Sequence, residues 1–210
     1  MTTTTKVSGV NFLRDHWQWR PDWAVDRAYL LWYLTFVEAE LEARIHTVQQ
    51  ALTDVPALDL VPPSWLHVTL DDVGFVDELL PAVVDDVIAA ARVGLRDVEL
   101  PSLRLGPIAT TASAVVLLAE PADELSRLRD RLRAATIAVL GTRALAELQN
   151  FRPHVSLAYA SRAVARESLE ARLSATQADP IVVPTAQVTL AAVTRRDHHY
   201  QWTVREVLGG

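Results

Sequence analysis

The chain of 210 residues contains no cysteine. This absence excludes disulfide bonds, thiolate metal ligands and cysteine nucleophiles together, and it is compatible with a reducing compartment. The seven glycines are scattered and form no phosphate-cradling loop pattern. Apolar runs such as Val115–Ala119 are far too short to cross a bilayer. Met1 leads into threonines and a lysine without a basic-then-apolar signal segment, so we expect a cytoplasmic protein with no membrane partner.

Excess positive charge is also missing, since 20 basic and 26 acidic residues give a formal net charge of −6. Proteins that coat long nucleic acids usually present a basic face, because neutralising phosphates releases counterions. An acidic balance argues against such a long footprint. It leaves room for a site that holds one or two phosphates with a few local cations.

Half of the residues are apolar, which suits one compact globular unit or two closely packed lobes. Residues 1–26 are polar and then rich in tryptophan (Trp17, Trp19 and Trp23), which predicts an arm with local turns, in which His16 is expected to be solvated. Residues 27–207 interleave strand and helix patterns and are predicted to form a single α+β domain. The predicted strands are Arg27–Val37, Trp65–Val73, Val98–Leu105, Ala114–Ala119, Pro153–Tyr159, Ala186–Thr194 and Tyr200–Val207, with a turn at Gly106-Pro107. The predicted helices are Glu38–Leu52, Asp77–Val93, Pro121 to Gly141 and Arg166–Leu173.

A short internal repeat is the feature that carries chemistry. The segment His67-Val68-Thr69-Leu70 recurs as His154-Val155-Ser156-Leu157, and both copies lie inside a strand pattern. Residues i and i+2 of a strand point to the same face. Each copy therefore presents an imidazole beside a hydroxyl, with branched apolar residues on the opposite face.

Two such copies suit transfer at a phosphodiester. A base must take a proton from the nucleophile and an acid must protonate the leaving oxygen, and histidine can do either near neutral pH. The hydroxyls of Thr69 and Ser156 can donate to the non-bridging oxygens, where negative charge builds in the transition state. This scheme requires neither a metal nor another cofactor.

The paired motifs resemble the 2H phosphoesterase superfamily, which includes 2′-5′ RNA ligase-like proteins and RNA 2′,3′-cyclic phosphodiesterases. The second copy, Phe151 to Leu157, and the final stretch Val188–Val207 with Tyr200 carry the resemblance most closely. It spans roughly residues 27–207, and the Trp-rich arm has no counterpart in it. The resemblance implies a bilobal, pseudo-symmetric α+β fold, with two antiparallel sheets flanking a central groove and helices on the outside. It also implies that His67 is the acid and His154 the base.

Three further residues are candidates for binding substrate. Arg152 is in phase with His154 and can reach a phosphate, although a surface arginine is nearly as good an interpretation. Trp65 can stack on a base or belong to the core. Tyr200 can hydrogen-bond a phosphate or pack in the last hairpin.

Metal and acyl-transfer interpretations are weaker. Asp197-His198-His199 is typical of metal-dependent phosphoesterases, but between two strand patterns it indicates a hairpin loop. A second open interpretation is a metal site formed by His67, His154 and Asp71, although their spacing fits no familiar metal motif. Ser156 lacks the glycine-flanked elbow of a nucleophilic serine, and His46 is expected to be solvated.

These features predict a monomeric enzyme that acts on 2′,3′-cyclic phosphate or 2′-5′ linkages of RNA ends or small nucleotides. The alternative is a module that binds nucleotides or RNA ends at the same place without turnover. A structural duplication without activity is also compatible with the repeat. The arm either caps the groove and selects substrates or simply fastens itself to the domain.

Overall fold

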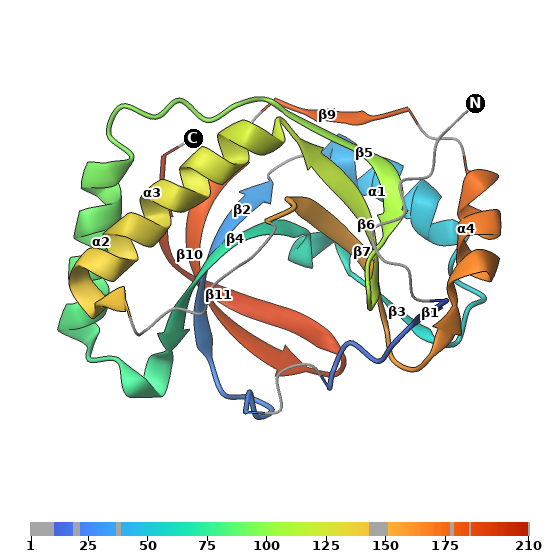
Figure 1. Cartoon of the computed structure of the whole chain (residues 1–210), viewed down its shortest axis with the longest axis horizontal. Coiled ribbons are helices and arrows are strands. Elements are labelled where there is room, and N and C mark those ends of the chain that lie inside the picture. Colours follow the sequence, from blue (N-terminus) through green and yellow to red (C-terminus); the bar gives the residue numbers. More distant parts are fainter. Residues whose placement is uncertain are drawn as a thin grey trace.

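The computed structural model describes residues 11–18, 22–36, 39–142, 151–176, 179–184 and 186–209. Antiparallel strands form its centre and helices lie along its outside (Figure 1). The helices are α1 Ala39–Gln50, α2 Pro81–Gly94, α3 Ala122–Leu140 and α4 Arg166–Ser174, with short 3-10 turns η1 Pro63–Trp65 and η2 Val76–Glu78. The strands are β1 Phe12–Leu13, β2 Tyr29–Phe36, β3 Leu58–Leu60, β4 His67–Phe75, β5 Leu103–Thr110, β6 Ala114–Glu120, β7 His154–Ala160, β8 Val164–Ala165, β9 Ile181–Val183, β10 Ala186–Arg196 and β11 His199–Leu208.

The main sheet consists of two halves. Its strand order is β11-β10-β2-β4-β7-β6-β5-β9, with β3 beside β7, while β1 and β8 form a separate pair. The halves meet between β4 and β7, where the described residues make one pair, Val68 with Val155. Helices α2 and α3 cover one half and α1 and α4 lie beside the other (Figure 1). This arrangement confirms the predicted bilobal α+β fold with antiparallel sheets and outer helices.

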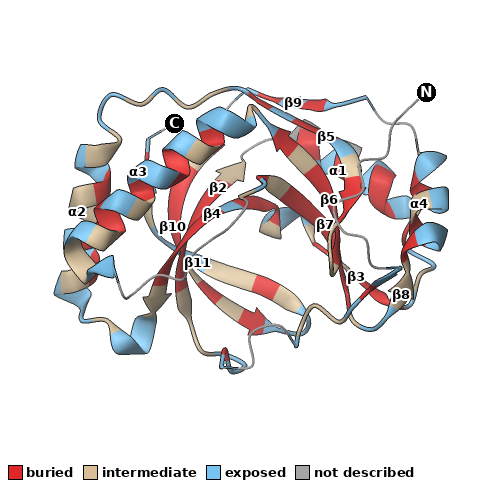
Figure 2. Cartoon of the chain, in the orientation of Figure 1, coloured by how far each residue is buried: buried red, intermediate tan, exposed pale blue. Residues whose placement is uncertain are grey.

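The burial pattern follows from this layering. Residues 30–34 of β2 are buried on both faces, because Trp32 packs against Thr136 of α3 on one face and Tyr33 packs against His67 and Trp202 on the other. Helix α3 instead buries one stripe, which includes Leu125, Leu128 and Leu132, and exposes its outer side (Figure 2). Three-to-four-residue spacing produces such a stripe on a helix. Gly141, with φ +80°, caps the C-terminus of α3 as predicted.

Two predicted boundaries were wrong. The helix predicted from Asp77 begins at Pro81, because residues 76–78 form η2 and the proline ring suits the first helical turn. The strand predicted over Val98–Leu105 begins at Leu103 and continues to Thr110.

The predicted turn at Gly106-Pro107 was also wrong. Leu105 pairs with Ala119 and Ile108 pairs with Leu117, so Gly106 and Pro107 form an irregularity inside β5. Gly106 has φ +136°, a conformation that other residues rarely adopt. The chain reverses instead at residues 111–113.

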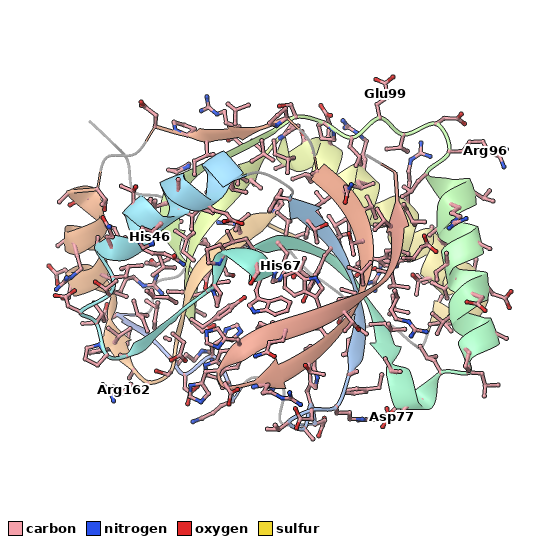
Figure 3. The ribbon with its side chains drawn as sticks, turned by 180° about the vertical axis from the view of Figure 1, so that it is seen from behind. His46, His67, Asp77, Arg96, Glu99 and Arg162 are labelled. Atoms are coloured by element: carbon pink, nitrogen blue, oxygen red, sulfur yellow. The ribbon has the colours of Figure 1, made fainter. Side chains whose placement is uncertain are left out.

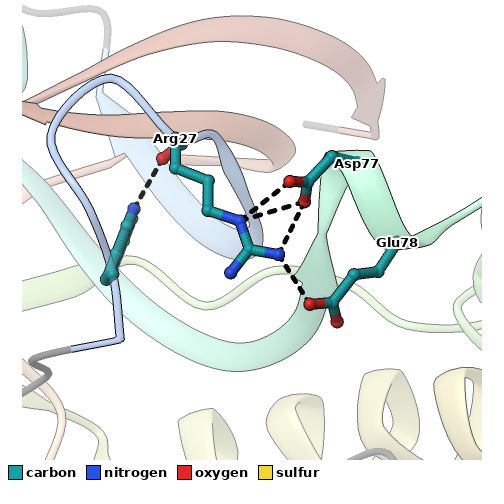
Figure 4. Close-up of polar contacts among 4 residues, drawn as sticks. Arg27, Asp77 and Glu78 are labelled. Atoms are coloured by element: carbon teal, nitrogen blue, oxygen red, sulfur yellow. Dashed lines mark hydrogen bonds and ion pairs between the residues drawn. The ribbon is translucent and has the colours of Figure 1, made fainter.

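The N-terminal arm packs on the domain. Leu13 and Trp23 are buried. The backbone N–H of Arg14 donates to the carbonyl oxygen of Ala112, in the turn between β5 and β6 (2.9 Å). The Trp23 indole donates to the Arg27 carbonyl (2.7 Å), and the Arg27 side chain forms ion pairs with residues 77 and 78 (Figure 4). Trp19 lies outside the described residues. The division into an arm over 1–26 and a domain over 27–207 stays a prediction.

No helix within the described ranges is both long and apolar enough to span a bilayer.

Candidate functional site

Both motif strands carry the same backbone irregularity. In β4, Thr69 pairs with Tyr33 while Asp71 pairs with Trp32, so Leu70 is an extra residue. In β7, Ser156 and Ala158 pair with the neighbouring residues 116 and 115, so Leu157 is the extra residue. Each β-bulge directly follows the hydroxyl residue of its motif. The repeat seen in the sequence is therefore also a repeat of backbone structure.

The pairing of Val68 with Val155 sets the faces of these strands. Residues directly opposite one another in an antiparallel pair share a face. The residues on either side of each valine point to the other face, so His67, Thr69, His154 and Ser156 lie on one common face, called here the motif face. The structure thus brings both predicted pairs together at the junction of the halves. Figure 3 shows His67 near the centre of the molecule, with His46 and Arg162 at its periphery.

The two imidazoles are held in the same way. Nδ1 of His67 lies 2.8 Å from the Trp65 carbonyl oxygen, and Nδ1 of His154 lies 2.7 Å from the Arg152 carbonyl oxygen. A carbonyl oxygen can only accept, so each Nδ1 carries the proton and donates it. In the neutral rings this leaves each Nε2 with a free lone pair, and among the described residues neither Nε2 has a hydrogen-bond partner. Both rings are thus prepared to exchange a proton at Nε2.

Burial keeps both imidazoles neutral. The pKa of His67 is lowered to about 4: desolvation is the main cause, the bond to the Trp65 carbonyl opposes it, and the charge of His154 adds a smaller decrease. The pKa of His154 is also lowered, again chiefly by burial. His67 is 6% exposed and His154 is half-buried, so water reaches His154 more readily. A bound anion would stabilise the protonated form of either ring.

The hydroxyl partners differ in exposure. Thr69 is exposed, whereas Ser156 is 9% exposed. Tyr33 lies opposite Thr69, and the Thr69 side chain partly offsets the rise in the Tyr33 pKa that burial causes. Because of the bulge at Leu157, Tyr159 falls on the same face as Ser156. Neither Tyr33 nor Tyr159 was a candidate from the sequence. In a regular strand, Tyr159 would point to the face opposite Ser156, so its place on the motif face depends on the bulge.

Aromatic rings pack around His67. Tyr33 stacks on it with ring centroids 3.9 Å apart, and Trp202 meets it edge-on at 5.1 Å. Trp65 is half-buried against Trp202, with centroids 4.8 Å apart, and it lies in η1 rather than in the predicted strand. A cavity of about 160 Å³ adjoins this group, lined by Trp202 and Leu66 among others. The predicted stacking role of Trp65 stays a prediction.

The remaining candidates are placed differently. Arg152 is exposed, and the contact it makes with the site is through its carbonyl oxygen. The Tyr200 hydroxyl lies 2.9 Å from Nε2 of His16. His16 was expected to be solvated, but it is partly buried and stacks on Tyr159, with centroids 4.2 Å apart. His46 is exposed, as predicted.

Asp71 does not share the motif face. The bulge at Leu70 turns it to the side of Trp32, whose indole lies against α3, and its carboxylate pairs with Arg133 at 3.0 Å and Arg129 at 4.0 Å. This geometry removes the open alternative in which Asp71 completes a metal site with the two histidines. In the described part of the chain, no three His, Cys, Asp or Glu side chains are grouped closely enough to hold a metal ion. The Asp197-His198-His199 segment forms a hairpin turn, as predicted.

A larger cavity of about 610 Å³ lies elsewhere, between the end of α2 and the end of β11, with Arg92 and Arg96 in its wall. It contains neither motif histidine. The case for chemistry at the motif face therefore depends on how its side chains are placed, and this larger cavity adds nothing to it.

The fold and the site together define a class. Two antiparallel halves that each present one histidine-x-hydroxyl motif on a common face are the architecture of the 2H phosphoesterases. The family model of the 2'-5' RNA ligase superfamily matches residues 37–199, and the chain belongs to this family.

Solved structures agree with this assignment. The protein TT0787 of Thermus thermophilus is 24% identical with a TM-score of 0.63, over 86% of this chain and 96% of that one. Apo LigT of E. coli is 16% identical with a TM-score of 0.60, over 86% and 96%. E. coli LigT complexed with 3'-AMP is 16% identical with a TM-score of 0.57, over 88% and 99%. At these identities the likeness shows the fold. No curated protein matches the sequence.

Proposed function

We propose that this protein is a metal-independent phosphoesterase that acts on 2′,3′-cyclic phosphate or 2′-5′ phosphodiester linkages of RNA ends or small nucleotides. His67 and His154 would supply the proton transfers. Thr69 and Ser156, with Arg152 and Tyr200 as further candidates, would bind the phosphate, and Trp65 would stack on a base.

The observation that carries the proposal is the matched state of the two imidazoles. Both rings donate from Nδ1 to the carbonyl of the residue two positions earlier, and neither Nε2, on the motif face, has a hydrogen-bond partner in the part of the chain that the structure describes. A histidine kept for packing alone does not require its tautomer to be set. Two histidines set in the same way, one from each half, suit an acid and a base on opposite sides of one phosphate.

The proposed hydrolysis proceeds in one balanced step. His154, as the neutral ring, takes a proton from water at Nε2 while the water oxygen forms a bond to phosphorus. The bond from phosphorus to the 2′ or 3′ oxygen breaks, and protonated His67 gives its Nε2 proton to that oxygen. With a 2′-5′ linkage a ribose hydroxyl takes the place of water, and ligation reverses the roles.

Small substrates suit the surroundings of the site. The net charge of −6 disfavours a long nucleic-acid footprint. The E. coli protein LigT, which has a similar fold, has been crystallised with 3'-AMP. Trp65 and Trp202 contact one another beside His67, and aromatic rings in such a place can stack on a base.

The test is a cyclic-phosphate hydrolysis assay on purified His67→Ala and His154→Ala variants. Each variant should lose about 100-fold or more in kcat, because each removes one member of the acid–base pair. His46→Ala is the matched control, since His46 is exposed on α1, and it should retain the full rate.

Full turnover in both motif variants would refute the assignment. Wild-type protein that binds cyclic nucleotides but never turns them over would instead indicate the non-catalytic binding module. Activity that is abolished by EDTA and restored by a divalent ion would contradict the metal-independent scheme.

A further inference from the structure

Trp17, on the N-terminal arm, lies between the two halves of the protein. Its indole N–H donates to Asp59 Oδ2 on β3, at 2.9 Å, and its ring packs edge-on against Tyr159 of β7, with centroids 5.4 Å apart. Strands β3 and β7 pair within one half. The same ring packs against Tyr200 of β11, in the other half, at 5.3 Å. One side chain of the arm therefore contacts both halves.

The turn between β10 and β11 completes this contact. His198 stacks on the Trp17 ring with centroids 5.3 Å apart, and its Nδ1 lies 2.9 Å from the same Asp59 Oδ2. The next residue, His199, has its Nε2 3.2 Å from the Leu60 carbonyl oxygen of β3. Figure 1 shows the hairpin of β10 and β11 reaching toward β3. We call Trp17, Asp59 and His198 the clasp, because together they bind the hairpin of one half to a strand of the other.

The clasp lies at the edge of the motif face. Asp59 is directly opposite Tyr159, which shares this face, so the two side chains point the same way. Tyr159 contacts Tyr200, with centroids 5.4 Å apart, while Trp202, two residues further along β11, contacts His67. Strand β11 is therefore turned to the motif face from His67 as far as Tyr159, and the clasp bounds that face at Tyr159.

The clasp is fixed close to the reacting groups. The His16 N–H donates to the Ala160 carbonyl at the end of β7 (2.7 Å), and the Arg195 guanidinium donates to the Trp17 carbonyl. A strand rises about 3.3 Å per residue, so this end of β7 lies within about 20 Å of His154 at its beginning. A nucleotide chain that ran from the motif histidines along β7 would meet Trp17 there.

We propose that the clasp blocks the path of a polynucleotide on one side of the motif face, and that Trp17 is a specificity-determining residue that excludes linkages inside an RNA chain. An internal linkage needs room for nucleotides on both sides of its phosphate, whereas a terminal cyclic phosphate or a dinucleotide needs much less. The family model matches only from residue 37, so the tryptophan of the clasp lies outside it. This inference rests on the proposed function, because it removes internal linkages from the proposed substrates.

The test compares a 2′-5′ dinucleotide with the same linkage flanked on both sides by several 3′-5′-linked nucleotides. Wild type should cleave the internal linkage with a kcat/KM at least about 10-fold lower than that of the dinucleotide. Trp17→Ala should raise the ratio of the two kcat/KM values by about 10-fold, because removing the indole opens the path, and should leave kcat on the dinucleotide within a few-fold of wild type. Trp17→Phe keeps a bulky ring and should change the ratio less.

Two further variants separate blocking from packing. Phe12→Ala is the matched control, because Phe12 is an aromatic residue of the same arm that is 54% exposed, and it should leave the ratio unchanged. His198→Gly keeps the test decisive if Trp17→Ala folds poorly. It removes the stacked ring from an exposed turn, where glycine readily adopts the φ of +56°, and it should also raise the ratio. An unchanged ratio in both Trp17→Ala and His198→Gly, or wild type that cleaves both substrates equally well, would overturn the inference.

Turnover of the dinucleotide by wild type tests the proposed function separately. If wild type cleaves neither substrate, the proposed function fails, while calorimetry with the two ligands still tests the clasp. Trp17→Ala should then gain affinity for the longer oligonucleotide relative to the dinucleotide. An unchanged ratio of the two dissociation constants would overturn the role of the clasp.

Discussion

The two motif histidines differ in their access to water. His67 is 6% exposed and its pKa is lowered to about 4, chiefly by burial, so it can act as the acid only after a bound phosphate has stabilised its protonated form. His154 is half-buried, so water reaches this residue more readily than His67. Access to water suits His154 as the base, and the assignment of His67 as the acid stays what the family resemblance implies.

A substrate that needs no acid tests these roles. In a 2′-5′ dinucleotide with sulfur in place of the leaving 5′ oxygen, the leaving thiolate is stable without protonation. His67→Ala should lose much less kcat on this substrate than on the oxygen ester, whereas His154→Ala should lose about 100-fold on both, because the nucleophile still needs a base. If the sulfur-containing substrate instead restores the kcat of His154→Ala and not that of His67→Ala, then His154 is the acid and His67 the base.

The β-bulges connect the motif strands to the rest of the fold. The alternation of residues in the sequence was enough to predict that histidine and hydroxyl share a face in each copy. It could not predict the extra residues Leu70 and Leu157, because a bulge depends on pairing with a neighbouring strand. For this reason the sequence missed Tyr159 and left Asp71 as a possible ligand. The irregularity at Gly106 escaped prediction for the same reason, since glycine next to proline is equally typical of a turn.

Asp71 has a structural role in this account, since it links β4 to α3 through Arg129 and Arg133. Asp71→Asn leaves the two arginines without this carboxylate. Because burial outweighs both arginines and raises the pKa of Asp71 to about 6, the carboxylate gains only part of the pair's attraction, and the expected loss of stability is about 1–3 kcal/mol, less than for a fully buried pair. Chemical denaturation should show this loss, while kcat at a temperature where the variant is folded should stay within a few-fold of wild type.

Asp77→Asn is the matched control for Asp71→Asn. It removes a carboxylate of similar size from the exposed ion pair with Arg27, and it should change the midpoint of unfolding far less. Loss of turnover in Asp71→Asn with an intact fold would show that Asp71 belongs to the chemistry.

The whole molecule is two halves that meet at Val68 and Val155, tied together a second time by the arm. The domain was predictable because each half repeats the same motif and its helices and strands have clear periodicity. The arm was not, because an aromatic segment without periodicity does not reveal what it packs on. Its contacts come from residues far away in the sequence, among them Ser113 and Tyr200.

The claim on which the account depends is that imidazoles from both halves share one bound anion. The most direct measurement is an NMR pH titration of the histidine rings with and without phosphate. Without phosphate, His67 should stay neutral down to about pH 4, and His154 should titrate below the usual pKa of an imidazole, because burial lowers both pKa values. With saturating phosphate, signals of both rings should shift and the pKa of at least one should rise, since the anion stabilises imidazolium, while exposed His46 should not change. If phosphate perturbs only one of the two rings, or neither, the two histidines do not act on a common phosphate.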